Sequence, residues 1–253
     1  VLVKDAPCQE VVMEGELVDL DCLPIPTYCL QDGGAFITHG IQISKDPETG
    51  TRNAGIYRMQ QKGRNRLGLF SNVQQHCFIH YSKAEARGEG LEVAVAMGTD
   101  PVIMMGTQVK ADYGTDELAL SGGLSGKAVE VVKCRTVDLE VPATSEIVIE
   151  GRLITNYREE EGPFGEFSGY YGPASERPVL EVTAITHRDS PIYHAGLTGV
   201  PMTENHFLKQ IPGEVTLYRE LKSKFPEVKL IENKENLGYC EGCLLYTSDA
   251  ADE

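Results

Sequence analysis

The feature that most constrains this sequence is a series of short β-type segments that recur along most of its length. They are rich in Val, Ile and Thr, and turn-forming stretches such as DPETG (46–50) and SGGLSG (121–126) separate them. The segments are 35–44, 91–98, 128–134, 146–153, 179–187 and 191–199. Helical patterns are fewer, at 72–88 and at 212–225, where Pro212 and Glu214 predict the helix start. This pattern predicts an α+β fold with a β-barrel or sandwich at its centre and flanking helices.

Composition narrows the possible partners. The 253 residues are 41% hydrophobic and 24% charged, as in ordinary soluble domains, and the net charge is −15. That charge argues against nucleic acid or an anionic membrane as the main partner, although a local arginine or metal ion can still hold an anionic ligand. No run approaches the roughly 18 apolar residues of a membrane span, so we expect no transmembrane segment.

The seven cysteines are an odd, scattered set, which is typical of reduced thiols and predicts a cytoplasmic protein. Cys240 and Cys243 form a CxxC, but without a second pair for zinc or a βαβ context for redox chemistry we expect no function for it. Reverse-translated, the ending CLLYTSDAADE resembles the transposon-end adapter of sequencing libraries. We therefore expect 243–253 to be a cloning or sequencing scar, and the chain to be an internal fragment.

The segment NAGIYR (53–58) offers two kinds of ligand-binding group. Asn53 presents a neutral oxygen to a hard cation, and Arg58 is a permanently charged fork for a carboxylate or phosphate. Because they are an odd number of residues apart, a regular strand would place them on opposite faces, so they meet only if the chain bends. The alternative is a capped turn followed by a surface arginine.

Two further segments carry possible metal ligands. His76 and His80 are four residues apart on the expected helix, which is metal-ligand spacing, but they lack the acid of an HExxH motif. The alternative is one core and one surface histidine. Asp116 and Glu117 follow a glycine turn, and either could cap a helix or complete an oxygen-rich metal site with Asn53 and His76.

The stretch EGPFGE sets Glu161 and Glu166 on either side of a Gly-Pro-Phe-Gly turn. It is either a solvated acidic turn or a rigid loop that aims a carboxylate at a reacting atom. Paired carboxylates that interact with each other or with an arginine have their pKa values driven apart, which can make one of them a proton donor near neutral pH.

Taken together, these segments resemble the UbiD family of reversible (de)carboxylases over roughly residues 8–205. The blocks that carry the resemblance are VDLDCLPIPTYCLQDGGAFITHGIQISKDPETGTRNAGIYRMQ, the pair Gln75-His76, VVKCRTVDLEVPATSEIVIEG, EGPFGEFSGYYG, PVLEVTAITHRDSPIYHAG and PMTEN. The resemblance implies non-oxidative, reversible decarboxylation of an aromatic or α,β-unsaturated carboxylic acid, through a covalent adduct with prenylated FMN. Ubiquinone biosynthesis and aromatic acid metabolism are the settings it implies.

The resemblance also implies an architecture. Residues 1–205 would form a split β-barrel of the flavin reductase type, 206–242 the start of a truncated C-terminal region, and the family's N-terminal part would be missing. A flavin prenyltransferase would supply the cofactor, and the full-length parent would be a homo-oligomer.

A set of site residues follows from the resemblance. Mn²⁺ would be held by Asn53, His76 and Glu117 and would bridge to the flavin phosphate, with K⁺ possible nearby. Arg58 would orient the substrate carboxylate, Glu161 would tune the network, and Glu166 would supply the proton that replaces CO₂. The implied cofactor-binding residues are Asn53, Ala54, Gly55, Ile56, Tyr57, Arg58, Gln75 and His76. Two alternatives are a flavin- or metal-binding fragment without turnover, and an unrelated hydrolase that uses the two glutamates as an acid/base pair.

Overall fold

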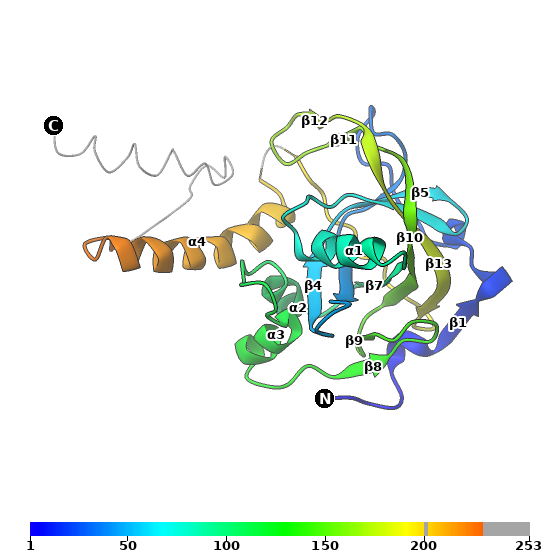
Figure 1. The fold of residues 1–253 in the computed structure, drawn as a ribbon, viewed down its shortest axis with the longest axis horizontal. Helices are drawn as coiled ribbons and strands as arrows, with labels where there is room; N and C mark the ends of the chain where they lie inside the picture. The colour runs from blue at the N-terminus through cyan, green and yellow to red at the C-terminus, as the bar shows by residue number, and fades with distance from the viewer. Residues whose placement is uncertain (200–201, 230–253) are drawn as a thin grey trace.

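The computed structural model describes residues 1–199 and 202–229 and shows a mixed α and β fold built on one large antiparallel sheet (Figure 1). Along the sheet the strand order is β2-β5-β6-β13-β10-β7-β3-β4, with β1 paired to β13. Its strands are β1 (Val11–Glu14), β2 (Phe36–Ile37), β3 (Ile41–Lys45), β4 (Arg52–Ile56), β5 (Met59–Gly63), β6 (Arg66–Leu69), β7 (Leu91–Met97), β10 (Ile147–Glu161) and β13 (Ser175–His187). Two small sheets are formed by β8 (Val131–Lys133) with β9 (Glu140–Pro142), and by β11 (Phe164–Gly165) with β12 (Tyr171–Gly172).

Residues 1–199 and 202–229 also form four α-helices: α1 (His76–Ala86), α2 (Pro101–Gly106), α3 (Glu117–Ser125) and α4 (Glu204–Lys224). Three short 3₁₀ turns occupy Pro7–Gln9, Gly15–Leu17 and Leu20–Cys22. Helix α1 lies over β3, β4, β7 and β10, whereas α2 and α3 pack together and α3 contacts β4. Helix α4 extends away from the sheet (Figure 1). No helix in the described part of the chain is long and apolar enough to cross a membrane.

The sheet is buried on both faces, and the alternation of its strands divides the core in two. In β7, Val93 and Val95 belong to one apolar cluster, while Ala94 and Ala96 between them belong to the other. This is the two-residue period of a pleated strand. The small side chains of the second pair leave room for the elements on that face, which include part of α2 and α3.

The hairpin of β10 and β13 places one candidate loop. The two strands pair from Ile147↔His187 to Glu161↔Ser175, with irregularities between Glu150 and Gly151 and between Leu153 and Arg158. Glu161 is therefore the last residue of β10, and the Gly-Pro-Phe-Gly turn begins where the strand ends.

The structure confirms the α+β class and shows a large antiparallel sheet, while the split β-barrel and the boundaries at 205 and 242 stay predictions. One expected strand is wrong, because 191–199 forms no ladder. Side chains bind its backbone instead: the Thr38 hydroxyl donates to Gly196 O at 2.7 Å, and Gly196 N donates to the same hydroxyl at 3.1 Å. The expected strand 35–44 is likewise interrupted between β2 and β3.

The expected helix 212–225 has the wrong start. Helix α4 begins at Glu204, and Pro212 lies inside it. The start is set by Thr203, because the side chain of His206, the third helical residue, accepts at Nδ1 from the Thr203 backbone N–H at 3.0 Å, as in a capping box. Cys240, Cys243 and the expected scar 243–253 lie outside the described residues.

Candidate active site

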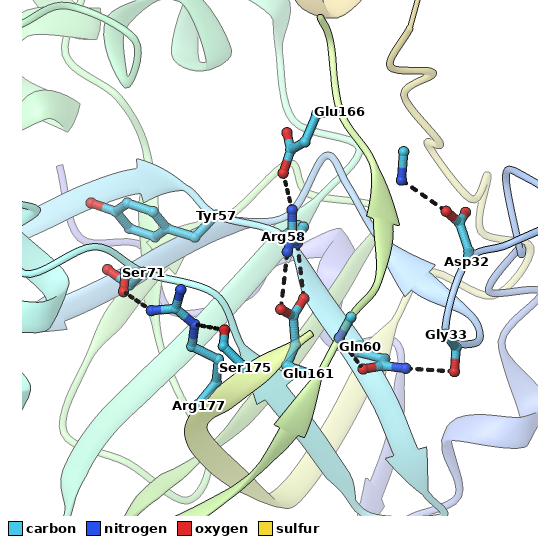
Figure 2. Close-up of polar contacts among 12 residues, drawn as sticks. Asp32, Gly33, Tyr57, Arg58, Gln60, Ser71, Glu161, Glu166, Ser175 and Arg177 are labelled. Atoms are coloured by element: carbon cyan, nitrogen blue, oxygen red, sulfur yellow. Dashed lines mark hydrogen bonds and ion pairs between the residues drawn. The ribbon is translucent and has the colours of Figure 1, made fainter. Parts of the chain in front are cut away.

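Arg58 and Glu161 form a two-point ion pair inside the protein (Figure 2). Arg58 Nε donates to Glu161 Oε1 at 2.8 Å, and Nη2 donates to Oε2 at 3.0 Å. The side chains are 8% and 0% exposed. Arg58 reaches this position because the chain bends between the end of β4 and the start of β5, so it does not follow the alternation of β4. The alternative of a surface arginine is therefore wrong.

The same guanidinium binds the second glutamate of the motif. Arg58 Nη1 donates to Glu166 Oε1, so one arginine bridges two carboxylates (Figure 2). The two acids differ in exposure, because the Glu166 side chain is 32% exposed whereas Glu161 is sealed. Glu166 is therefore the more accessible carboxylate, and Arg58 links it to the buried Glu161.

Aromatic rings enclose the arginine. The Arg58 Cζ atom lies 3.9 Å from the centroid of the Phe70 ring and 4.8 Å from that of Phe164. Arg177 also packs on Phe70, at 4.4 Å, and donates to Ser175 Oγ at 3.0 Å. Guanidinium groups interact favourably with ring faces, and the rings keep water away from the ion pair.

The EGPFGE loop is fixed by a second loop and by β5 (Figure 2). Asp32 Oδ1 accepts from Gly165 N at 2.9 Å, and Gln60 Oε1 accepts from Gly162 N at 2.9 Å. Gly33 N donates to Pro163 O at 2.8 Å, and a Cβ on Gly33 would lie 2.1 Å from Gly162 O. Only glycine allows this approach. The motif is therefore a rigid loop rather than a solvated acidic turn.

A second polar cluster forms where α1 and α3 begin against β4. Glu117 is the first residue of α3 and its side chain is 5% exposed. Its Oε2 accepts from Ala54 N at 2.8 Å, and its Oε1 lies 3.7 Å from His76 Nδ1. Burial raises the pKa of Glu117 and lowers that of His76. Asn53, next to Ala54, is 3% exposed, and its side-chain Nδ2 has no hydrogen-bond partner.

The donor chemistry of this cluster fits a hard divalent cation. Within 1–199 and 202–229, no group of three or more His, Cys, Asp or Glu side chains is placed to hold a metal ion, so an ion here would take the Asn53 amide as its third protein ligand. The 3.7 Å between His76 and Glu117 is too long for a hydrogen bond. An ion with ligand distances of about 2.0–2.2 Å can contact both atoms. A neutral imidazole, a carboxylate and an amide oxygen are suitable ligands for Mn²⁺.

The other predicted metal-spaced histidine lies outside this cluster. His80 is 3% exposed, and its Nδ1 pairs with Ser44 Oγ at 2.9 Å. Burial lowers the pKa of His80 to about 4. His80 is thus the core histidine of the alternative interpretation, while the partly exposed His76 faces Glu117. Asp116 caps α3 by accepting from Leu118 N at 3.0 Å, so it takes the capping role weighed for these two acids, and the metal role of Glu117 stays a prediction.

The remaining predicted cofactor contacts hold their local backbone. Gln75 Oε1 accepts from Asn72 N at 2.6 Å at the start of α1. Gln42 clamps Tyr57 by accepting from its N–H at 2.7 Å and donating to its carbonyl at 2.6 Å. The Tyr57 ring covers Gly55, where a Cβ would lie 2.6 Å from the hydroxyl oxygen. The Tyr57 side chain therefore occupies the space beside Gly55.

Sequence reasoning missed the residues that hold the loop and flank the arginine. They are Asp32, Gln60, Phe70 and Arg177. No local spacing marks them, since Asp32, Gln60 and Arg177 act on partners about 100 or more positions away and Phe70 lies 12 positions from Arg58. Asp32 lies directly before two glycines, and that loop signal is the only local hint.

Comparison with known proteins identifies the family. The UbiD family profile, described as the 3-octaprenyl-4-hydroxybenzoate carboxy-lyase Rift-related domain, matches residues 1–201. The chain belongs to the UbiD family. An uncharacterized protein of Archaeoglobus fulgidus is 40% identical over 224 residues, which cover 88% of this chain and 46% of that protein. The uncharacterized protein sll0936 of Synechocystis is 39% identical over 198 residues, 78% of this chain and 40% of its own length.

Solved UbiD-class structures share the fold. An evolved dimeric form of HmfF from Pelotomaculum thermopropionicum, in complex with prFMN, is 43% identical with a TM-score of 0.86, over 90% of this chain and 53% of that one. Vanillic acid decarboxylase of Sedimentibacter hydroxybenzoicus, in closed form, is 35% identical with a TM-score of 0.86, over 90% and 50%. This UbiD chain thus spans about half the length of the relatives it matches. The expected homo-oligomer, prenyltransferase and cytoplasmic location stay predictions.

Proposed function

We propose that this UbiD chain carries the flavin-binding core of a carboxy-lyase that reversibly removes CO₂ from an aromatic or α,β-unsaturated carboxylic acid with prenylated FMN. The observation that carries the proposal is one guanidinium, Arg58, that bridges the sealed Glu161 and the partly exposed Glu166. Family membership and the prFMN-bound relative support it.

Each member of the network has a role in this reaction. Arg58 presents a fixed positive fork, which orients a substrate carboxylate beside the flavin. Glu161 holds the plane of that fork and balances its charge from the buried side. Glu166 moves the proton: it delivers H⁺ to the carbon that carried the carboxylate, and in carboxylation it removes H⁺ from the same carbon.

The cofactor would occupy the neighbouring cluster. Prenylated FMN, when bound, supplies the electron sink that no side chain can offer to a decarboxylating carbon. Asn53, His76 and Glu117 would hold Mn²⁺ against the flavin phosphate, which needs a cation in a protein of net charge −15. Residues 54–58 and Gln75 would line the cofactor, and a K⁺ ion near this site belongs to the same proposal.

The test is a matched pair of isosteric variants, Glu166→Gln and Glu161→Gln, in the gene product that carries this chain, co-expressed with a flavin prenyltransferase. We expect Glu166→Gln to keep the flavin absorbance and to lose CO₂ release and H/D exchange by about 100-fold or more. Glu161→Gln should lower both rates and also destabilise the protein, because it removes the buried partner of Arg58. Full turnover by Glu166→Gln would overturn its role as proton donor.

Two other outcomes would redirect the proposal. Retained flavin and metal without exchange in the unmodified protein would support a binding fragment without turnover. Glycoside hydrolysis without flavin would support a carboxylate-pair hydrolase. We do not propose the latter, because both carboxylates bind the same guanidinium instead of facing a space between them.

A further inference from the structure

One face of α1 carries three functional groups, and a single tyrosine covers them. His76, His80 and Lys83 lie at positions i, i+4 and i+7 of the helix, so they share a face. The Tyr113 ring meets His76 edge-on at 5.2 Å and His80 at 5.8 Å. Lys83 Nζ lies 5.1 Å from the centroid of the same ring. Tyr113 therefore touches one ligand of the proposed metal site and the two residues behind it.

The tyrosine hydroxyl is anchored to a buried acid. Asp46, in the turn between β3 and β4, has a 0% exposed side chain. Its Oδ2 accepts from the Tyr113 hydroxyl at 2.5 Å and from Lys83 Nζ at 2.8 Å, while Oδ1 accepts from Glu48 N at 2.8 Å. A charge-assisted bond to a buried carboxylate fixes the hydroxyl much more firmly than a bond to solvent does.

Tyr113 also lies in the turn that directly precedes α3 and its first residue, Glu117. Residues 112–115 form a turn in which Thr115 N donates to Asp112 O at 3.1 Å and Gly114 has φ 91°. A glycine with positive φ at the third position is typical of a type II turn. Asp116 follows and binds Arg52 of β4, Nη2 to Oδ2, at 2.6 Å.

Three tethers in succession thus bind 113–117 to the β3–β4 hairpin. They are Tyr113 to Asp46, Asp116 to Arg52, and Glu117 to Ala54 N. We propose that Tyr113 is a positioning residue for the metal site: its hydroxyl fixes the turn before Glu117, and its ring fixes the imidazole of His76. One side chain thereby sets two ligands that come from different helices. This inference rests on the proposed function, since it concerns the Mn²⁺ ligands named there.

The test measures Mn²⁺ affinity, with MnCl₂ as the only added ligand, from the EPR signal of free Mn²⁺ in titrations of the full chain. Tyr113→Phe keeps the ring and loses the bond to Asp46. We expect its dissociation constant to rise about 10-fold, as is typical when a group that orients a metal ligand is removed. Tyr113→Leu, which also loses the ring contact with His76, should weaken binding further.

Tyr157→Phe is the matched control. It also removes a hydroxyl bound to a carboxylate, Glu159 Oε1 at 2.8 Å, but on β10. Its Mn²⁺ affinity should equal that of the unmodified chain, whereas a general loss of stability would affect both phenylalanine variants. If Tyr113→Phe binds Mn²⁺ as tightly as the unmodified chain while His76→Ala does not bind it, the positioning role of Tyr113 is overturned and the metal site stands. Absence of binding in the unmodified chain would overturn the metal site itself, and the role of Tyr113 with it.

Discussion

The two polar clusters of this chain differ in how completely the protein satisfies them. Arg58, Glu161 and Glu166 are joined to one another by three hydrogen bonds. In contrast, Glu117 faces His76 across 3.7 Å, and the buried Asn53 Nδ2 has no partner. A buried polar group without a partner is costly, and it persists in functional proteins where a ligand completes it. The first cluster is therefore paired within itself as folded, whereas the second leaves polar groups without a partner, as the proposed ligand site requires.

The largest expected effect comes from breaking the complete cluster. Arg58→Met removes the cation and leaves the fully buried Glu161 without a counter-charge. We expect the free energy of unfolding to fall by about 3–5 kcal/mol, the usual cost of breaking a buried pair from one side. Urea unfolding at pH 7 measures it.

Arg152→Met is the control for that loss. Arg152 pairs with Glu92 at 2.5 Å, but its side chain is 59% exposed. Exposed pairs contribute at most about 1 kcal/mol, so the control should lose little. Equal losses in the two variants would mean that the burial of the Arg58 pair does not matter.

The next largest effect is a dependence of folding stability on pH, caused by His80, which lies one helical turn after His76 on α1. Burial lowers the pKa of His80 to about 4. An unfolded histidine titrates near 6.5, so between about pH 6.5 and 4 the unfolded chain binds a proton that the folded one does not. Stability therefore falls on acidification through this window, by up to about 3 kcal/mol for one group.

Urea unfolding at several pH values tests this dependence, with His80→Gln expected to flatten the slope between pH 6.5 and 4. His39, whose pKa burial also lowers to about 4, keeps part of the slope. Glu85→Gln is the control. Hydrogen bonds from Arg158 lower the pKa of Glu85 to about 2. The stability that Glu85 contributes is therefore lost only below about pH 4.5, so Glu85→Gln should leave the slope between pH 6.5 and 4.5 unchanged. An unchanged slope in His80→Gln would contradict the assignment.

Metal addition probes the incomplete cluster directly. A ligand at 100 times its dissociation constant stabilises the folded state by about 2.7 kcal/mol. We expect Mn²⁺ at that ratio to raise the free energy of unfolding of the unmodified chain by this amount. Glu166→Gln should respond equally, whereas Glu117→Gln should not respond. Loss of the Mn²⁺ effect in both variants would mean that the two clusters are not separate.

Much of the fold was predictable from the sequence, because alternation is a local signal. The expected strand 91–98 matches β7, Leu91–Met97, since each of its residues is committed to one face of the sheet. The segment 191–199 also carries β-forming residues, Ile192, Tyr193 and Thr198, but it is not a strand. Whether it pairs was decided by Thr38, which lies more than 150 residues away and binds its backbone. Tertiary partners of this kind leave no trace in local composition.

The residues of the candidate site were likewise predictable only where a local sequence signal marks them. Glu161 and Glu166 were visible because a rigid turn lies between them, and Glu117 because it follows a glycine turn. Asp32 and Gln60 were not visible, since they hold the loop through backbone atoms of residues over 100 positions away. Only the folded chain brings such groups together, and local spacing cannot report them.

The smallest expected effect comes from removing a helix N-cap, and it distinguishes a cap that only stabilises its helix from one that also positions Glu117. Asp116→Ala removes the N-cap of α3, the bond to Leu118 N at 3.0 Å, together with the tether to Arg52. Loss of an N-cap costs about 1 kcal/mol. Asp100→Ala is the matched change in α2, because Asp100 also caps its helix and accepts from Val102 N at 2.9 Å.

Both variants should lose about 1 kcal/mol in urea unfolding through the cap, and Asp116→Ala should lose up to about 1 kcal/mol more with its ion pair to Arg52. Only Asp116→Ala should also weaken Mn²⁺ binding, because Asp116 directly precedes Glu117 and holds it against β4, whereas α2 carries no proposed ligand. Equal Mn²⁺ affinities in the two cap variants would mean that the bond from Ala54 N alone orients Glu117. The second cluster would then be arranged by β4 itself, and the tethers before α3 would serve only the stability of that helix.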